Sequence, residues 1–405
     1  MFHRSYAGKF ISIVIIIAVM TTFLTSGCSS GENSNRSSSL STRQQETASG
    51  TETSGSTIAD NSGATTAGSS DKTTETSGSG TISGSATGTV DNEPAQPAGT
   101  IVPGNIKPDE SGKVIVLMFH NFISEYKTGG DKEWTTTYDK FRKLLQDLYD
   151  RGYRLISLLD YLKGNIDVPE GKMPIVFTFD DGTAGQFNLV EENGSLMANK
   201  NSAVGVMEEF AASHPDFGLK GTFYVYFGGS VFSGSGTIAQ RLKYLIGEGF
   251  EIGNHTYSHI NFATVKTAEQ VQKELGENNN KMLELIPGYS MDTMALPFGE
   301  TTKSLASYLV KGIYNNIVYN NLAVLKVGWD PNLSPFMIKF NPQDIHRVRN
   351  SGLKPVDGDL DWWLARLTPA DLYVSDGDPA TVTVPKSKQG LISKGRLNGR
   401  KLLVY

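Results

Sequence analysis

Four side chains that can bind a metal or move a proton stand in two short clusters of this 405-residue chain. Asp180 and Asp181 are adjacent, and His255 and His259 are four positions apart. On a helical turn, a spacing of four places both imidazoles on one face, as paired metal ligands require. Two neutral imidazoles and one carboxylate form a ligand set that leaves coordination positions open for water and substrate. Either cluster alone also fits a polar turn, so a metal site is indicated only if the fold brings the two together.

Each cluster follows an apolar segment, and so does a further histidine. Residues 175–179 (IVFTF) precede the two aspartates, residues 250–252 precede the two histidines, and residues 114–119 (VIVLMF) precede His120. Continuous apolar runs are typical of strands buried on both faces. Further strands are expected at residues 155–156, 221–226, 294–296 and 324–327, and helices at residues 138–149, 203–212, 237–246 and 267–285.

The repeated alternation of strands and helices predicts the fold class. It indicates an α/β protein with a parallel sheet, and this many units indicate a barrel. Active sites of such barrels lie at the carboxyl ends of the strands. Three of the six histidines follow predicted strand ends. The sequence therefore predicts that both clusters form one metal site there.

The same segments resemble the motifs of the polysaccharide deacetylases, the NodB-homology enzymes of carbohydrate esterase family 4. Residues 177–182 (FTFDDG) resemble the first motif, residues 255–259 (HTYSH) the second and residues 296–299 (LPFG) the third. Residues 220–225 (KGTFYV) are similar to a strand of that family, and the resemblance covers roughly residues 112–330. It implies a distorted (β/α)7 barrel and a metal-dependent hydrolase that removes N-acetyl groups from sugars.

The resemblance also implies a role for each residue of the two clusters. Asp181, His255 and His259 would bind the metal, usually Zn2+ although other divalent metals can serve. Asp180 would be the general base. The metal would polarise the acetamide carbonyl and lower the pKa of a bound water, and the base would accept the proton of that water.

Three further residues are expected to contact the reacting group or the substrate. By resemblance, the backbone N–H of Phe298 would be a second donor to the oxyanion. Pro297 precedes it in the third motif. Trp329 is a possible match to a tryptophan that the fourth motif places near the base, and it fits a core residue equally well.

The sequence departs from the family's usual pattern at the acid and at the group that orients the base. His120 is the favoured general acid, because a subset of extracellular deacetylases resembles this chain in having the acid histidine after the first strand. His346 is the alternative, although no apolar strand precedes it. Ala295 stands where the third motif usually has an arginine. What orients Asp180 is therefore left open.

The first 27 residues are predicted to be a bacterial lipoprotein signal. Arg4 and Lys9 form a basic start, and residues 11–24 form a short apolar run. Cys28, the only cysteine of the chain, follows the small residues that end this segment and would be lipidated. The alternative is an ordinary signal peptide or an uncleaved anchor with an incidental cysteine.

Residues 28–106 are predicted to be a disordered tether. Of the 72 residues 29–100, 41 are Ser, Thr or Gly and none is aromatic, so the segment cannot bury enough apolar surface to fold. A flexible coil of this length would span roughly 45–50 Å. Residues 107–350 are the expected barrel, and residues 351–405 are a C-terminal extension expected to pack on it.

Composition narrows the class of function. A single cysteine excludes a disulfide framework and a cysteine-based zinc cluster within the chain, and a net charge of -5 argues against nucleic acid as a partner. The expected enzyme is a monomer, lipid-anchored at the extracellular face of the cell membrane. Its expected substrate is an N-acetylglucosamine polysaccharide such as peptidoglycan or poly-N-acetylglucosamine. An O-acetyl polysaccharide esterase and a catalytically weak glycan-binding lipoprotein are the alternatives.

Overall fold

The computed structural model describes residues 107–127, 130, 132–350 and 356–405. All of them belong to one compact unit, Thr89–Tyr405. The predicted signal, the predicted tether and Cys28 lie outside the described residues. Among the residues described, no helix combines the length and the apolar character that a membrane span needs.

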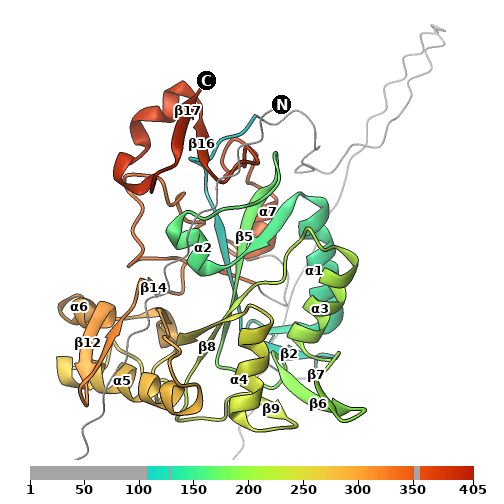
Figure 1. The fold of residues 1–405 in the computed structure, drawn as a ribbon, viewed down its shortest axis with the longest axis vertical. Coiled ribbons are helices and arrows are strands. Elements are labelled where there is room, and N and C mark those ends of the chain that lie inside the picture. Colours follow the sequence, from blue (N-terminus) through green and yellow to red (C-terminus); the bar gives the residue numbers. More distant parts are fainter. Residues whose placement is uncertain (1–106, 128–129, 131, 351–355) are drawn as a thin grey trace, which may run out of the picture. The chain divides into compact units, whose positions relative to one another are not determined.

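A parallel sheet forms the centre of this unit (Figure 1). Its strands are β1 (Ile115–Phe119), β4 (Tyr153–Ile156), β5 (Met173–Asp180), β8 (Thr222–Val225), β10 (Glu251–Asn254), β11 (Thr293–Ala295), β14 (Ala323–Leu325) and β15 (Val348–Arg349). Their order is β14–β11–β10–β8–β5–β1–β15, and β4 pairs with the first half of β5. Every one of these pairings is parallel.

An irregular segment joins the two ends of this strand order. Ile345 donates a backbone hydrogen bond of 3.1 Å to Val324 and accepts one of 2.8 Å from Lys326. Three residues further along, β15 begins, and its Val348 pairs with Leu117 of β1. The seven strands of this order, without β4, therefore curl into a ring whose last contact is irregular. This arrangement confirms the predicted distorted (β/α)7 barrel.

Helices cover the outer side of the sheet (Figure 1). They are α1 (Tyr138–Asp150), α2 (Leu158–Lys163), α3 (Ala203–Ser213), α4 (Ile238–Gly247), α5 (Ala268–Leu285), α6 (Ala306–Val310) and α7 (Leu360–Leu364). Threonine side chains cap several of the helix starts: Thr137 accepts a hydrogen bond from the N–H of Lys140, and Thr237 forms a capping box with Gln240.

Short strands and 3₁₀ turns complete the fold. The strands are β2 (Asn121–Ile123), β3 (Thr135–Thr137), β6 (Asn188–Glu192), β7 (Ser195–Ala198), β9 (Ser233–Gly234), β12 (Lys311–Tyr314), β13 (Ile317–Asn320), β16 (Thr381–Val384) and β17 (Lys401–Val404). Residues 186–219, between β5 and β8, contain β6, β7 and α3. Of these elements, α3 packs beside α1.

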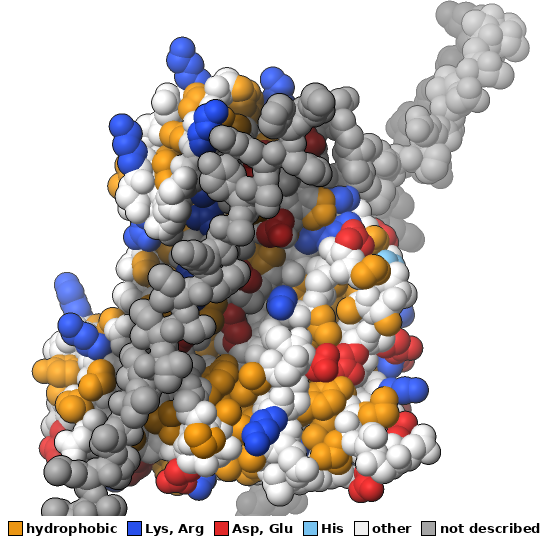
Figure 2. Space-filling view, viewed as in Figure 1, with side chains coloured by type: hydrophobic (Ala, Val, Ile, Leu, Met, Phe, Trp, Pro, Cys, Tyr) orange, Lys and Arg blue, Asp and Glu red, His pale blue; other side chains and the backbone are white. Residues whose placement is uncertain are grey.

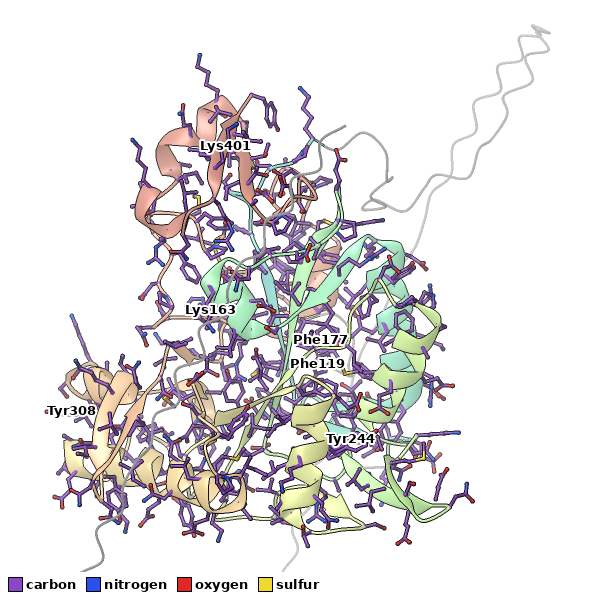
Figure 3. The ribbon with its side chains drawn as sticks, in the orientation of Figure 1. Phe119, Lys163, Phe177, Tyr244, Tyr308 and Lys401 are labelled. Atoms are coloured by element: carbon purple, nitrogen blue, oxygen red, sulfur yellow. The ribbon has the colours of Figure 1, made fainter. Side chains whose placement is uncertain are left out.

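Alternation along the strands decides which side chains face the barrel interior. Phe119 and Phe177 pack with Phe141 of α1 between sheet and helix, and the first two rings meet edge to face with centroids 5.3 Å apart (Figure 3). Side chains one position away point to the other face of the sheet. Val176 and Tyr224 accordingly belong to a separate cluster of buried residues that fills the interior.

The C-terminal segment packs against the first described residues. Lys113 donates a backbone hydrogen bond of 2.8 Å to Asp371 and accepts one of 2.9 Å from Tyr373. Val374 and Asp109 pair in the antiparallel sense. Figure 2 shows Lys and Arg side chains at the surface around β16 and β17. Because these contacts bury both segments, the C-terminal residues are part of the folded unit.

Glu110 lies inside this contact. Its side chain is 2% exposed, and it accepts hydrogen bonds from the hydroxyl of Tyr373 at 2.8 Å and from the backbone of Thr383 at 2.7 Å. Burial raises the pKa of Glu110 from 4.5 to about 7. The carboxylate of Asp376 adds to this shift, and the hydrogen bonds offset only part of it.

This carboxyl group should make stability depend on pH. The folded chain holds the proton of Glu110 up to about pH 7, whereas the unfolded chain releases it near 4.5. The resulting stabilisation is complete below the unfolded value and is lost as pH rises through the folded value. We expect the free energy of unfolding to fall by about 2–3 kcal/mol between about pH 5 and pH 8 through this group. Urea unfolding of wild type and Glu110→Gln across that range measures it, and a slope that is equally steep in the variant would contradict the assignment.

Candidate active site

A pocket of about 470 Å³ opens at the carboxyl ends of the barrel strands. Its lining residues are His120, Asn121, Trp134, Asp180, Asp181, His255, His259, Leu296, Phe298 and Val327. The volume lies in the range of ligand-binding pockets, and the position is the one at which α/β barrels carry their chemistry. Both clusters of the sequence analysis and His120 therefore line one cavity.

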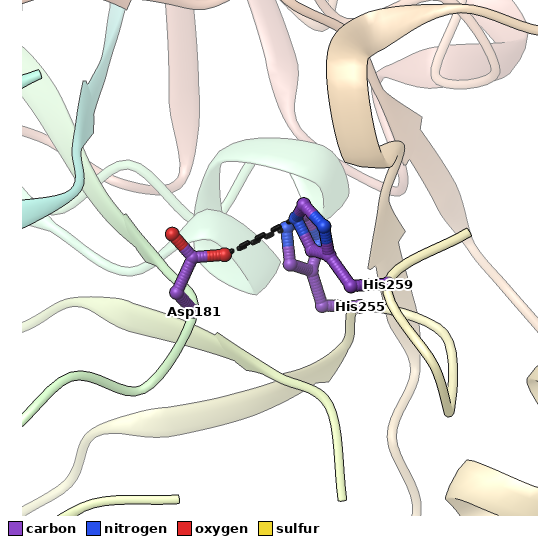
Figure 4. Close-up of side chains that lie close together, drawn as sticks. All are labelled: Asp181, His255 and His259. Atoms are coloured by element: carbon purple, nitrogen blue, oxygen red, sulfur yellow. Dashed lines mark ion pairs between the residues drawn. The ribbon is translucent and has the colours of Figure 1, made fainter. Parts of the chain in front are cut away.

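Asp181, His255 and His259 converge in this pocket (Figure 4). One ligand atom from each lies within 4.8 Å of the others. Oδ1 of the carboxylate is 3.5 Å from Nε2 of His255 and 3.2 Å from Nε2 of His259. Nδ1 of His255 lies 2.9 Å from the carbonyl oxygen of Ala295, to which it donates its proton. Because Nδ1 is used in that bond, Nε2 is the ring nitrogen left to bind a metal.

The three residues fit a divalent cation. Oδ1 of Asp181 is buried and has no hydrogen-bond partner within the described part of the chain. The two oxygen–nitrogen separations are close to the ligand–ligand distance of about 3.3 Å that tetrahedral Zn2+ coordination produces. Burial by itself raises the pKa of Asp181, but its contacts with the two imidazoles hold this pKa well below the ordinary value. The donor set is therefore one anion and two imidazoles.

The loop that carries both imidazoles is not the helical turn that their spacing suggested. Thr256 and His259 have φ angles of 64° and 57°, in the left-handed region. The side chain of Asn254 accepts a 2.8 Å hydrogen bond from the N–H of Thr256, and the carboxylate of Glu274 accepts one of 2.9 Å from the N–H of Ser258. Side chains of β10 and α5 thus fix a loop whose own backbone is irregular. The two rings therefore meet without a helical turn, because these tertiary contacts fix the backbone between them.

Arg347 orients Asp180. The arginine is fully buried, and its Nη1 and Nη2 donate to the two carboxylate oxygens at 2.5 and 2.7 Å. Its Nε donates to the carbonyl of Lys326 at 3.1 Å, which fixes the plane of the guanidinium. Burial alone raises the pKa of Asp180, but the guanidinium outweighs it and holds this pKa below the ordinary value. The residue directly before β15 thus supplies the cation that is missing at Ala295.

His120 is a further neighbour of the Asp180 carboxylate. Its Nε2 is 3.8 Å from Oδ2 of the carboxylate. The ring of Trp134 meets the imidazole at an angle of 63° with centroids 4.7 Å apart, and Arg349 lies over that indole. Burial lowers the pKa of His120, and the nearby carboxylates offset only part of that effect. The imidazole therefore faces both the carboxylate and the pocket.

His346, the alternative acid, lies elsewhere. It precedes Arg347 by one residue, so its side chain points to the opposite side of the chain. Its Nε2 is 3.7 Å from a carboxylate oxygen of Asp344, and it lines a different cavity, together with Asp330 and Asn341. The structure brings His120, and not His346, next to Asp180.

The three expected substrate contacts lie in different surroundings. Phe298 lines the pocket, is 60% exposed and has a φ of 60° in the turn after β11. Pro297 is buried in that turn and is not among the residues that line the pocket. Trp329 is 59% exposed, lies outside the pocket lining, and its carbonyl accepts a hydrogen bond from the indole of Trp363. Only the first of the three touches the cavity.

Part of the chain matches a known protein family. Residues 167–315 match the family model described as polysaccharide deacetylase. No curated protein matches the chain. This match covers both clusters of the site, so the part of the chain that carries them is similar to the polysaccharide deacetylases.

Several solved structures are similar to this chain. A polysaccharide deacetylase from Bacillus anthracis is 20% identical over 64% of this chain and 70% of its own, with a TM-score of 0.46. A polysaccharide deacetylase from Bacillus cereus is 20% identical over 62% and 68%, with a TM-score of 0.45. The deacetylase PplD from Streptococcus pyogenes, solved with acetate, is 15% identical over 64% and 96%, with a TM-score of 0.45.

Proposed function

We propose that this protein removes N-acetyl groups from an N-acetylglucosamine polysaccharide of the cell surface, such as peptidoglycan or poly-N-acetylglucosamine. A divalent metal, Zn2+ in the first instance, would be held by Asp181, His255 and His259. The observation that carries the proposal is one pocket in which a buried, ionised carboxylate, Asp180, stands beside these three ligands and beside His120. A binding protein would have no use for a base in that position.

Asp180 is suited to accept a proton from an attacking water. Arg347 keeps it ionised and fixes both carboxylate oxygens, so that the carboxylate is ready to act without reorganising. It lies 4.0 Å from Nε2 of His255, next to the ligand set. The metal, when bound, would polarise the acetyl carbonyl and acidify the water.

His120 is suited to protonate the leaving amine. Its Nε2 lies at the pocket surface within 3.8 Å of the base, on a ring held edge-on by Trp134. Leu296 and Phe298 add apolar wall to the same cavity. Such a wall excludes water and strengthens the electrostatic interactions of the charged groups. The two proposed catalytic groups, His120 and Asp180, therefore lie at the ends of the neighbouring strands β1 and β5.

Acetate release is the direct test. The full-length protein would be stripped of metal, reloaded with Zn2+ and assayed on chitin oligomers, poly-N-acetylglucosamine and peptidoglycan. We expect release that requires the metal, and His259→Ala should lose both zinc and activity because the site loses one ligand. Stoichiometric zinc binding without release from any of the three would contradict the proposed activity. Release from an O-acetylated xylan alone would replace it by an esterase.

A further inference from the structure

Gln186 connects the main chains of the two proposed catalytic residues. Its side chain is fully buried. The side-chain Nε2 donates one hydrogen bond of 2.6 Å to the carbonyl oxygen of His120 and another to the carbonyl oxygen of Asp180. Both acceptors are carbonyls, so the amide nitrogen must face them, and its two hydrogens serve one acceptor each.

These bonds begin where the ladder between β1 and β5 ends. The last paired residues of that ladder are Phe119 and Phe179. His120 and Asp180 come next in register, at the level at which the strands part to open the pocket. The amide of Gln186 therefore takes the place of the next rung and holds the two strand ends at a fixed separation.

The loop that carries Gln186 is itself fixed at several points. The N–H of Gln186 donates to Thr183 at 3.1 Å, and its carbonyl accepts from Val204 at the start of α3 at 3.0 Å. The hydroxyl of Thr183 lies 3.4 Å from the same His120 carbonyl that Gln186 contacts. The insertion after the first motif thus delivers a rigidly held amide to the backbone of the site.

We infer that Gln186 is a positioning residue, whose amide clamps the backbones of His120 and Asp180 and thereby sets the distance between the acid and the base. The inference rests on the proposed function for the roles of those two groups. The reactive atoms, Nε2 of His120 and Oδ2 of Asp180, are 3.8 Å apart. Each belongs to a residue whose backbone carbonyl accepts a hydrogen bond from Gln186. Because a displacement of about 1 Å in a catalytic group can cost about 100-fold in rate, a backbone clamp here has a direct effect on turnover.

The test replaces Gln186 by methionine, which keeps the length of the side chain and removes both hydrogens. We expect kcat to fall about 10- to 100-fold. KM should change less than about threefold, because the substrate-binding walls are untouched. A loss confined to KM, or a kcat within about twofold of wild type, would overturn the clamp.

Gln343 provides a matched control for lost hydrogen bonds. Its Nε2 donates to two backbone carbonyls, those of Asn321 and Leu322, at 3.4 and 3.1 Å, and it does not line the active-site pocket. Gln343→Met loses the same two kinds of bond elsewhere in the barrel. If Gln186 were only structural, both variants would lose stability with similar small effects on kcat, and that result would overturn the inference.

A readout without turnover keeps the inference separate from the proposed function. The imidazole Cε1–H resonance of His120, assigned by its absence in His120→Ala, reports the surroundings of that ring. The chemical shift of this resonance should change in Gln186→Met and remain unchanged in Gln343→Met. If wild type releases no acetate, the proposed function fails, while this comparison still decides whether Gln186 positions the ring: a shift supports the clamp and no shift overturns it.

Gln186→Glu covers the case in which the methionine variant does not fold. Its neutral carboxyl has nearly the same volume but a single hydrogen, so it can serve only one of the two carbonyls. We expect a kcat between those of wild type and Gln186→Met, or below wild type where the latter cannot be measured. Full wild-type turnover in Gln186→Glu would show that no double clamp is needed and would overturn the inference.

Discussion

Asp180→Asn is expected to lower the kcat of acetate release by about 10²- to 10⁴-fold, the range over which a general base contributes. The amide keeps the shape of the carboxylate but cannot accept the proton of the attacking water. Asp180 is 2% exposed and lies 3.8 Å from Nε2 of His120. Acetate release from the best substrate, measured with metal loading matched to wild type, checks this.

The control must separate the loss of the base from the loss of stability that a broken ion pair causes. Asp180→Asn leaves the guanidinium of Arg347 buried without its anionic partner, which can cost about 3–5 kcal/mol of stability. Asp359→Asn breaks another carboxylate–guanidinium pair, in which the partly buried Arg349 donates to the two oxygens at 2.9 and 3.2 Å. If both variants lose stability but only Asp180→Asn loses turnover, the loss is chemical. Equal losses of turnover would contradict the role of Asp180 as base.

Much of the barrel could be predicted because its strands are buried on both faces. Residues 175–179 are apolar without interruption, and the structure extends them to β5, Met173–Asp180. The strand ends then follow from the chain direction, since parallel strands present their carboxyl ends at one edge. Side chains alternate between the two faces of a strand. Because His120 and Asp180 each directly follow a phenylalanine that faces outward, both are expected to face the barrel interior.

The parts of the site that could not be predicted depend on irregular backbone. Arg347 belongs to a segment with no apolar pattern, and β15 has only two residues. The sequence analysis named only its neighbour His346, as the alternative acid, and left open which group orients Asp180. The role of Gln186 could not be predicted either, because its two hydrogen bonds form only when the loop after the first motif has folded.

Arg347→Met is expected to lower the stability of the protein strongly. It leaves the carboxylate of Asp180 buried without its cation, and breaking a buried pair in this way costs about 3–5 kcal/mol. In wild type the pKa of Asp180 is below its ordinary value, so the stabilisation from this pair is complete above the unfolded pKa of 3.8 and is lost only as pH falls through the lowered folded value. Urea unfolding at neutral pH measures the cost directly.

The same variant separates a positioning role from a merely structural one. Without the guanidinium, burial dominates and raises the pKa of Asp180, so the base becomes protonated at higher pH than in wild type. The acid limb of kcat/KM should therefore move to higher pH, and the loss of activity should be greater below neutral pH than above it. Arg154→Met is the matched control, because Arg154 is also buried and holds Asp216 through two bonds of 3.0 and 2.8 Å outside the pocket. An acid limb that stays in place in Arg347→Met, or moves equally in Arg154→Met, would mean that Arg347 supports the barrel without setting the protonation of the base.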